Sequence, residues 1–115
     1  MHYLLLIYGA ESLWEGVGEA EHQKIYGQYR ALREELQKTG KFLAGSQLQP
    51  VSTAATVRVN DGKKSLTDGP FAETKEQLGG YFLIDAKDRD EALAIAARIP
   101  SLHLGCVEVR PLVVH

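Results

Sequence analysis

Two stretches of consecutive apolar residues, Leu4–Ile7 and Tyr81–Ile84, constrain the fold of this chain more than any other feature. A strand with one face in water alternates apolar and polar residues, whereas a strand that is apolar at every position needs cover on both faces. Each stretch begins one half of the chain, and each half has the pattern strand, helix, strand. The sequence therefore predicts two central strands that are covered from both sides.

Hydrophobic periodicity and turn residues place the remaining elements. The first predicted helix has apolar side chains at helical spacing (Ile25, Tyr29, Leu32, Leu36), and the second begins at an Asp88 cap with Glu91 three residues on. It is expected to bury Ala92, Leu93, Ala96 and Ile99 and to end at Pro100. The predicted order is strand His2–Tyr8, polar loop Gly9–Gly18, helix Glu19–Thr39, strand Phe42–Leu48, a hairpin of residues 56–59 and 64–67 around Asp61-Gly62, strand Gly79–Ala86, the Asp88 helix, and strand Cys106–Val113.

This order of elements, β-α-β, hairpin, β-α-β, predicts an α+β fold of the ferredoxin-like split βαβ type with an inserted β-hairpin. Both helices would lie on one face of the sheet. The other face of the two apolar strands then needs a second sheet, and a second copy of the chain is the obvious source. We therefore expect a homodimer that packs sheet to sheet, although loops could also cover the runs.

Composition limits the class of protein. With 115 residues and 44% hydrophobic content, residues 1–115 are expected to form one domain. The net charge is −2 without a basic run, which argues against nucleic-acid or membrane binding. The only cysteine, Cys106, allows no internal disulfide, and its apolar strand predicts a buried, inert thiol. No apolar run is long enough for a membrane span, so a cytoplasmic protein is expected.

No metal or cofactor motif is visible. The four histidines lack the spacing of a metal site, and neither a dinucleotide nor a phosphate-binding glycine motif occurs. We therefore predict no cofactor. The pair Gly79-Gly80 begins a strand, so it indicates a bulge or a close backbone approach rather than a phosphate cradle.

The segment Asp68–Glu76 is the strongest candidate for a functional loop. Gly69 and Pro70 make its turn stiff, which would hold Asp68 and Phe71 in fixed directions. In the functional interpretation this loop roofs a cleft: Asp68, Glu73 and Lys75 line a polar rim, and Phe71 with Tyr81 contacts the apolar part of a ligand. In the structural alternative Asp68 bonds its own turn, Phe71 fills the core, and the charges form a solvated face.

Two further groups are weaker candidates. His22, Tyr26 and Tyr29 share one side of the first helix, either as the wall of a pocket or as the edge of the core. His103, in the turn before the last strand, could donate or accept a proton, but the sequence supplies no carboxylate to orient it, and a surface histidine is the commoner case.

The segment Asp68–Asp85, together with His2–Gly9, Leu43-Ala44-Gly45 and residues 107–111, resembles the DGPF-domain branch of the YciI-related family. The resemblance covers nearly the whole chain and implies a dimeric α+β barrel. The family is mostly uncharacterised, and some members are linked to sigma-factor regulators. Other branches place a histidine on the first helix and an aspartate before the proline that ends the second helix. Here Gln28 and Ile99 stand at those positions, and neither can exchange or orient a proton.

The leading hypothesis is a YciI-like, small-molecule-binding dimer, with cofactor-independent acid–base catalysis if chemistry occurs, because no activated nucleophile is apparent. The catalytic residues and the substrate stay open. A rival hypothesis is a non-enzymatic accessory module that contacts a partner such as a transcription regulator. A third is a stable dimer with a vestigial cleft.

Overall fold

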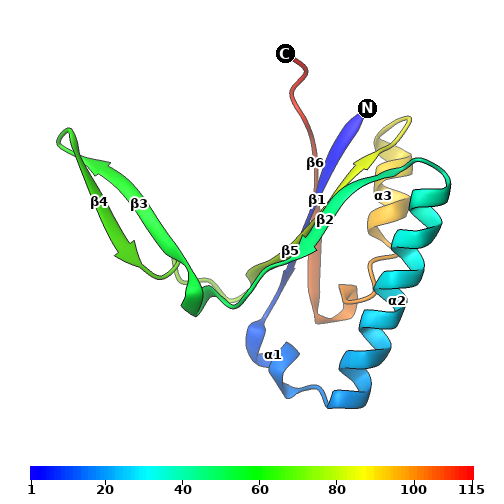
Figure 1. The fold of residues 1–115 in the computed structure, drawn as a ribbon, viewed down its shortest axis with the longest axis horizontal. Helices are drawn as coiled ribbons and strands as arrows, with labels where there is room; N and C mark the ends of the chain where they lie inside the picture. The colour runs from blue at the N-terminus through cyan, green and yellow to red at the C-terminus, as the bar shows by residue number, and fades with distance from the viewer.

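The strand β1 (His2–Gly9) lies inside a four-stranded sheet in the computed structural model, which describes residues 1–115 (Figure 1). The strand order is β2-β5-β1-β6, and every neighbouring pair is antiparallel. The predicted ferredoxin-like α+β fold, with both apolar strands central, is confirmed. The other elements are α1 (Glu11–Gly16), α2 (Glu19–Lys38), β2 (Phe42–Gln47), a 3₁₀ turn (Val51–Thr53), β3 (Ala55–Asn60), β4 (Lys63–Asp68), β5 (Gln77–Asp85), α3 (Arg89–Ala96), a second 3₁₀ turn (Leu102–Leu104) and β6 (Gly105–Pro111).

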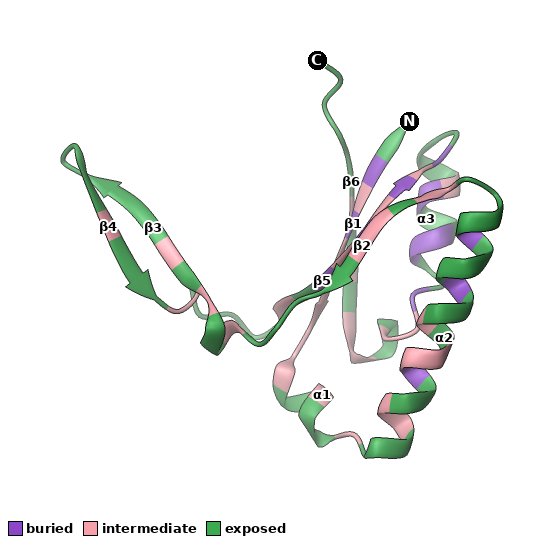
Figure 2. Ribbon diagram, viewed as in Figure 1, coloured by how far each residue is buried: buried purple, intermediate pink, exposed green.

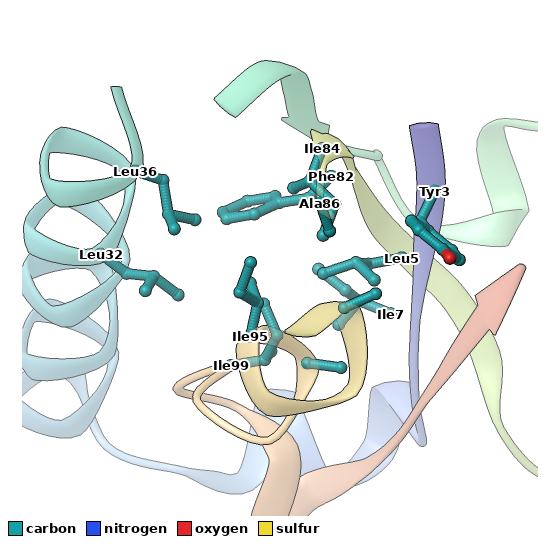
Figure 3. Packing of buried hydrophobic residues seen from close by; sticks show 12 residues of the cluster. Tyr3, Leu5, Ile7, Leu32, Leu36, Phe82, Ile84, Ala86, Ile95 and Ile99 are labelled. Atoms are coloured by element: carbon teal, nitrogen blue, oxygen red, sulfur yellow. The ribbon is translucent and has the colours of Figure 1, made fainter. Parts of the chain in front are cut away.

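Helices α2 and α3 cover one face of the sheet, and the core lies between them and that face (Figures 2 and 3). The predicted stripe of α2 is confirmed, since Ile25, Leu32 and Leu36 are buried and Tyr29 packs against the cluster. The prediction for α3 was wrong at Leu93, which is 38% exposed. The inward positions of α3 and the turn after it follow the helical spacing 92, 95, 96, 99, so Ile95 takes the place expected for Leu93.

The start of α3 follows its sequence signal. The Asp88 carboxylate accepts a hydrogen bond of 2.9 Å from the Glu91 backbone N–H, as an N-cap does. The Glu91 carboxylate in turn accepts hydrogen bonds from the Lys87 backbone N–H and from Lys41 Nζ, at 3.0 and 2.7 Å. The latter bond ties α3 to the beginning of β2.

The opposite face of the sheet has no helix on it. Leu4 lies opposite Leu83, and Leu6 lies opposite Tyr81, and these side chains alternate with the buried Leu5 and Phe82. We call this surface the open face. Its apolar centre is partly screened by neighbouring strands, but no other part of the chain lies over it in Figure 1.

Strands β3 and β4 form a separate two-stranded ribbon, Ala55–Asp68, which we call the arm. Asp61 and Gly62 occupy its turn with φ of 50° and 77°, so the Asp-Gly signal is confirmed. The arm projects from the body on the side of the sheet opposite the helices (Figure 1). It raises the radius of gyration to 16.1 Å, against roughly 13 Å for a compact domain of this length.

A bulge interrupts β5 where the sequence predicted one. Ile7 lies opposite Gly80 and Tyr8 opposite Leu78, which leaves Gly79 without a partner on β1. Gly80 also shows the close approach, because a Cβ atom there would stand 2.9 Å from the Ser46 carbonyl oxygen of β2.

No helix of this structure combines the length and the apolar character that crossing a membrane would require.

Candidate functional site

A cleft opens at the end of the sheet where β1 and β2 end and β5 begins, between the sheet and α2. Its volume of about 770 Å³ falls in the range of roughly 300–1,000 Å³ that is usual for small-molecule sites. Helix α1 stands at this end of the sheet, near the first turns of α2 (Figure 1). The aromatic, charged and polar residues that line the cleft are Tyr8, Glu11, Trp14, Glu15, Tyr26, Tyr29, Arg30, Arg33, Ser46, Gln47, Gln49, Gln77 and Ser101.

The sheet side of the cleft is partly bare backbone. Gly79 and Gly80 of β5 and Gly45 of β2 all line it. Because Gly80 has no room for a Cβ atom beside the Ser46 carbonyl, this part of the wall cannot be filled by a side chain. The bulge and the close approach of β5 to β2 therefore both lie in the wall of the cleft.

A partly buried polar contact in the cleft joins Tyr29 to Ser101. The Tyr29 Oη and Ser101 Oγ atoms lie 2.6 Å apart, and either hydroxyl can donate. Burial raises the pKa of Tyr29, and the hydrogen bonds with Ser101 lower it in part. Tyr29 is therefore a neutral phenol at physiological pH, which can donate a hydrogen bond but cannot serve as a base.

An aromatic cluster stands where α1 meets α2. The Trp14 ring centroid lies 4.3 Å from that of His22 and 5.6 Å from that of Tyr26. His22 Nε2 is 2.7 Å from the Trp14 carbonyl oxygen, so a protonated Nε2 donates to it. Tyr26 Oη accepts a hydrogen bond of 3.4 Å from Gln47 Nε2. Of the three residues predicted to share one side of the helix, Tyr26 and Tyr29 line the cleft. His22 does not line it and instead contacts Trp14.

Arg30 and Arg33 supply positive charge to the cleft. They lie one turn apart on α2, and neither takes part in any of the four ion pairs of the structure or donates a side-chain hydrogen bond. Both residues are exposed, and their guanidinium groups are free to bind an anion.

Glu11 organises the opposite wall. Its carboxylate accepts a hydrogen bond of 3.0 Å from the Val51 backbone N–H, and its own backbone N–H donates to Gln77 Oε1 at 2.9 Å. These bonds tie α1 to the base of the arm and to the first residue of β5. The cleft therefore includes both donors on α2 and a fixed carboxylate on α1.

Comparison with known proteins places this architecture in a family. The model of the YCII-related domain matches residues 1–114. An uncharacterised protein of Rhizobium meliloti (strain 1021) is 37% identical over 117 aligned positions, which cover 100% of this chain and 94% of the relative. The chain belongs to the YCII-related family.

In this YCII-related chain the segment predicted to roof the cleft lies outside it. None of Asp68, Phe71, Glu73 and Lys75 lines the cleft of its own chain. Backbone bonds hold the segment at the base of the arm: Gly69 N–H donates to the Ala54 carbonyl at 2.7 Å, and Thr56 Oγ1 donates to the Gly69 carbonyl at 2.8 Å. The segment is therefore an anchored loop, and the side chains of Asp68, Phe71, Glu73 and Lys75 are exposed on it.

The structural alternative for this segment was wrong for Phe71 and Asp68. Phe71 is 74% exposed, so it does not fill the core, and the Asp68 side chain accepts no hydrogen bond from its turn. Glu73 and Lys75 are exposed and form no ion pair, as the solvated-face interpretation expected. The Phe71 carbonyl accepts a hydrogen bond of 3.2 Å from Arg58.

The remaining predicted site residues divide between the two sides of the molecule. Tyr29 lines the cleft. Tyr81 lies opposite Leu6 and Ser46, on the open face. His103 is exposed in the 3₁₀ turn before β6, next to Ser101 and Leu104, which do reach the cleft.

The prediction of a buried Cys106 was wrong. Val107 and Val109 face the core, and Cys106 therefore falls on the open face, where it is exposed opposite Tyr8. Partial desolvation raises the pKa of the thiol, and the Glu76 carboxylate, 3.6 Å from Sγ, raises it further. The thiol is thus accessible but largely protonated at neutral pH.

The positions of the dyad expected from other branches of the YCII-related family lie away from this cleft. Gln28 is exposed on α2 beside a separate open hollow that Glu35 and Arg98 also line. Ile99 is 3% exposed and belongs to the core. The chemistry of this chain cannot be derived from that pair.

Sequence reasoning missed the two arginines, Trp14 and Ser101. A signal for the arginines existed, since Tyr26, Arg30 and Arg33 follow the same helical spacing as the aromatic stripe. No comparable signal marks Ser101, because it meets Tyr29 across 72 positions of the chain. Trp14 lies in α1, a helix of six residues that has no side-chain cap.

Proposed function

We propose that this protein binds a small molecule that combines an anionic group with an apolar or aromatic portion. The observation that carries the proposal is the pair of unpaired arginines, Arg30 and Arg33, at the edge of a cleft with aromatic side chains. A guanidinium group presents two parallel donors to a carboxylate or phosphate, which makes arginine suited to such ligands.

The rest of the cleft supports a ligand of mixed character. Trp14 and Tyr26 offer aromatic surface, whereas the Tyr29 and Ser101 hydroxyls offer hydrogen bonds. Gly79 and Gly80 present backbone without a side chain to the cleft. Apolar walls with a few placed polar groups are the usual form of small-molecule sites.

If the cleft is catalytic, we propose acid–base chemistry with neutral Tyr29 as a hydrogen-bond donor to a substrate oxygen. Glu11 is the carboxylate positioned to accept a proton, since the Val51 N–H holds one of its oxygens. Covalent catalysis is less well supported, because Cys106 lies on the open face and Ser101 has no adjacent base.

We further propose that the functional form is a homodimer joined through the open face. Leu4, Leu6 and Leu83 expose apolar surface there that nothing in the chain covers. In such a dimer the segment after β4 could reach the cleft of the second copy, although it does not reach the cleft of its own chain. The residues Asp68, Phe71, Glu73 and Lys75 therefore stay candidates for binding a ligand in the second copy's cleft. Tyr81, on the open face, would lie in the dimer interface.

A second candidate function is an accessory module that contacts a protein partner such as a transcription regulator. The observation that favours it is Phe71, which is 74% exposed on an anchored loop. Exposed aromatic side chains on rigid supports are common anchors of protein interfaces.

Thermal unfolding with defined probes tests the first candidate. Phenyl phosphate or benzoate should stabilise the wild-type protein, by about 2.7 kcal/mol at a concentration one hundred times its Kd. The Arg30→Ala/Arg33→Ala double variant should lose this stabilisation, while Lys24→Ala, an exposed cation on the same helix outside the cleft, should keep it. Stabilisation that survives in the double variant, or none from either probe, would refute the proposal.

A further inference from the structure

The arm carries Val57, Val59 and Leu66 on one face, which we call its apolar face although Lys64 and Asp68 lie at its two ends, and polar residues on the other. Both faces are in water in the single chain. Its register pairs Val57 with Leu66 across the two strands, and Thr56 with Thr67 on the other side. Val57, Val59 and Leu66 are 66%, 65% and 71% exposed. Apolar residues alternate along β3, and Leu66 of β4 joins them on the same side, which is the pattern of a strand pair with one covered face.

The arm cannot be covered by its own body. Its strands point away from the sheet, and Figure 2 shows it exposed over nearly its whole length. Isolated two-stranded ribbons are marginal in water, so a persistent arm needs a packing partner. A surface of this kind, separated from the core, indicates an interface.

The position of the arm indicates which partner covers it. The four-stranded sheet lies between the helices and the arm, so the arm stands on the side of the open face (Figure 1). A molecule seated on the open face would occupy the space between the sheet and the arm. A protein that packs on the open face can therefore contact the arm as well.

The areas of the two surfaces fit a second copy of this chain. From strand spacing and rise, the open face projects onto roughly 450 Å² and one face of the arm onto roughly 200 Å². A standard interface removes about 800 Å² from each partner. The sheet alone supplies little more than half of that area, and the arm supplies much of the rest.

We propose that the apolar face of each arm packs against a second copy of this chain, so that two arms clasp a two-fold dimer. The contact is reciprocal: the arm of each copy packs on the body of the other, as closed two-fold symmetry requires. This inference rests on the homodimer proposed above but not on ligand binding. Leu66, at the middle of the apolar face, is its central contact.

Neighbouring residues of β4 provide a matched test by sedimentation equilibrium. Leu66→Lys should weaken the dimer by at least about tenfold, because it places a charge in an apolar contact. Thr67→Lys adds the same charge on the polar face of the same strand and should change the dissociation constant by less than about threefold. Both side chains are exposed in the single chain, so neither variant should lose its fold, which circular dichroism checks.

The outcomes separate the arm from the dimer itself. A wild-type protein that stays monomeric overturns both proposals. A wild-type dimer that Leu66→Lys leaves unchanged overturns the arm contact and leaves a dimer joined by the open face alone. Hydrogen exchange gives a second readout: arm amides should be protected in the dimer and lose protection on dilution, and amides that exchange freely at every concentration would also refute the clasp.

Discussion

Replacing Gly80 by alanine tests whether the backbone of β2 excludes a side chain at this position of β5. The new Cβ atom would stand 2.9 Å from the Ser46 carbonyl oxygen and 3.5 Å from the Gln47 Cα. Both contacts are with backbone, so the edge strand β2 has to move. Overpacking of this kind costs about 1–3 kcal/mol, against a gain of about 0.4–1 kcal/mol from the less flexible unfolded chain.

Gly79 is the matched control for this substitution. A Cβ atom there would meet only the Ile7 carbonyl oxygen, at an ordinary contact distance of 3.8 Å. Neither glycine has a positive φ, so alanine can adopt both backbone conformations. Because the two variants share the gain from the unfolded state, their difference isolates the clash.

Urea unfolding at a fixed protein concentration measures that difference. Gly80→Ala should be about 1–3 kcal/mol less stable than Gly79→Ala, with the same dependence on urea concentration. Equal stabilities of the two variants, or a larger loss in Gly79→Ala, would refute the argument that the Ser46 carbonyl excludes a side chain.

Two titratable groups lead to further predictions. Lys41 lowers the pKa of Glu91 in the folded protein, chiefly through its hydrogen bond. The pair therefore stabilises the folded state above about pH 4.5, the ordinary pKa of a glutamate, and this stabilisation is lost as the pH falls through the lowered pKa of Glu91. Lys41→Met should therefore flatten the decline of urea midpoints below pH 5, and an unchanged profile would contradict the pairing. Cys106 should react slowly with an aromatic disulfide reagent at neutral pH, and Glu76→Gln should speed the reaction by lowering the raised thiol pKa; identical rates would show that Glu76 has no influence.

The parts of the fold that sequence could predict are those fixed by local chemistry. Asp61-Gly62 needs positive φ, and Asp88 caps the backbone N–H three residues later, so each determines its structure within a few residues. The α2 stripe follows from helical spacing, and the central strands follow from their apolar runs. Helix α1 gave no such signal, because it has six residues, no side-chain cap and no buried residue.

The cleft was less predictable because it depends on contacts between distant residues. Tyr29 reaches Ser101 across 72 positions, and Glu11 reaches Gln77 across 66. The Asp68–Glu76 segment attracted attention through its glycine, proline and aromatic residues, but composition could not show which way the segment leaves the sheet. Cys106 was misplaced for a related reason, since the inward phase of β6 depends on its pairing with β1.

The bulge at Gly79 has a consequence for how relatives of this protein should be aligned. A β-ladder counts residues in twos, so one residue more or fewer would turn every later side chain to the opposite side. Gly79 has no partner on β1, so it does not count toward this alternation. A relative that lacks one residue here can keep Tyr81–Asp85 in phase, whereas the same deletion a few positions later would exchange the core and the open face.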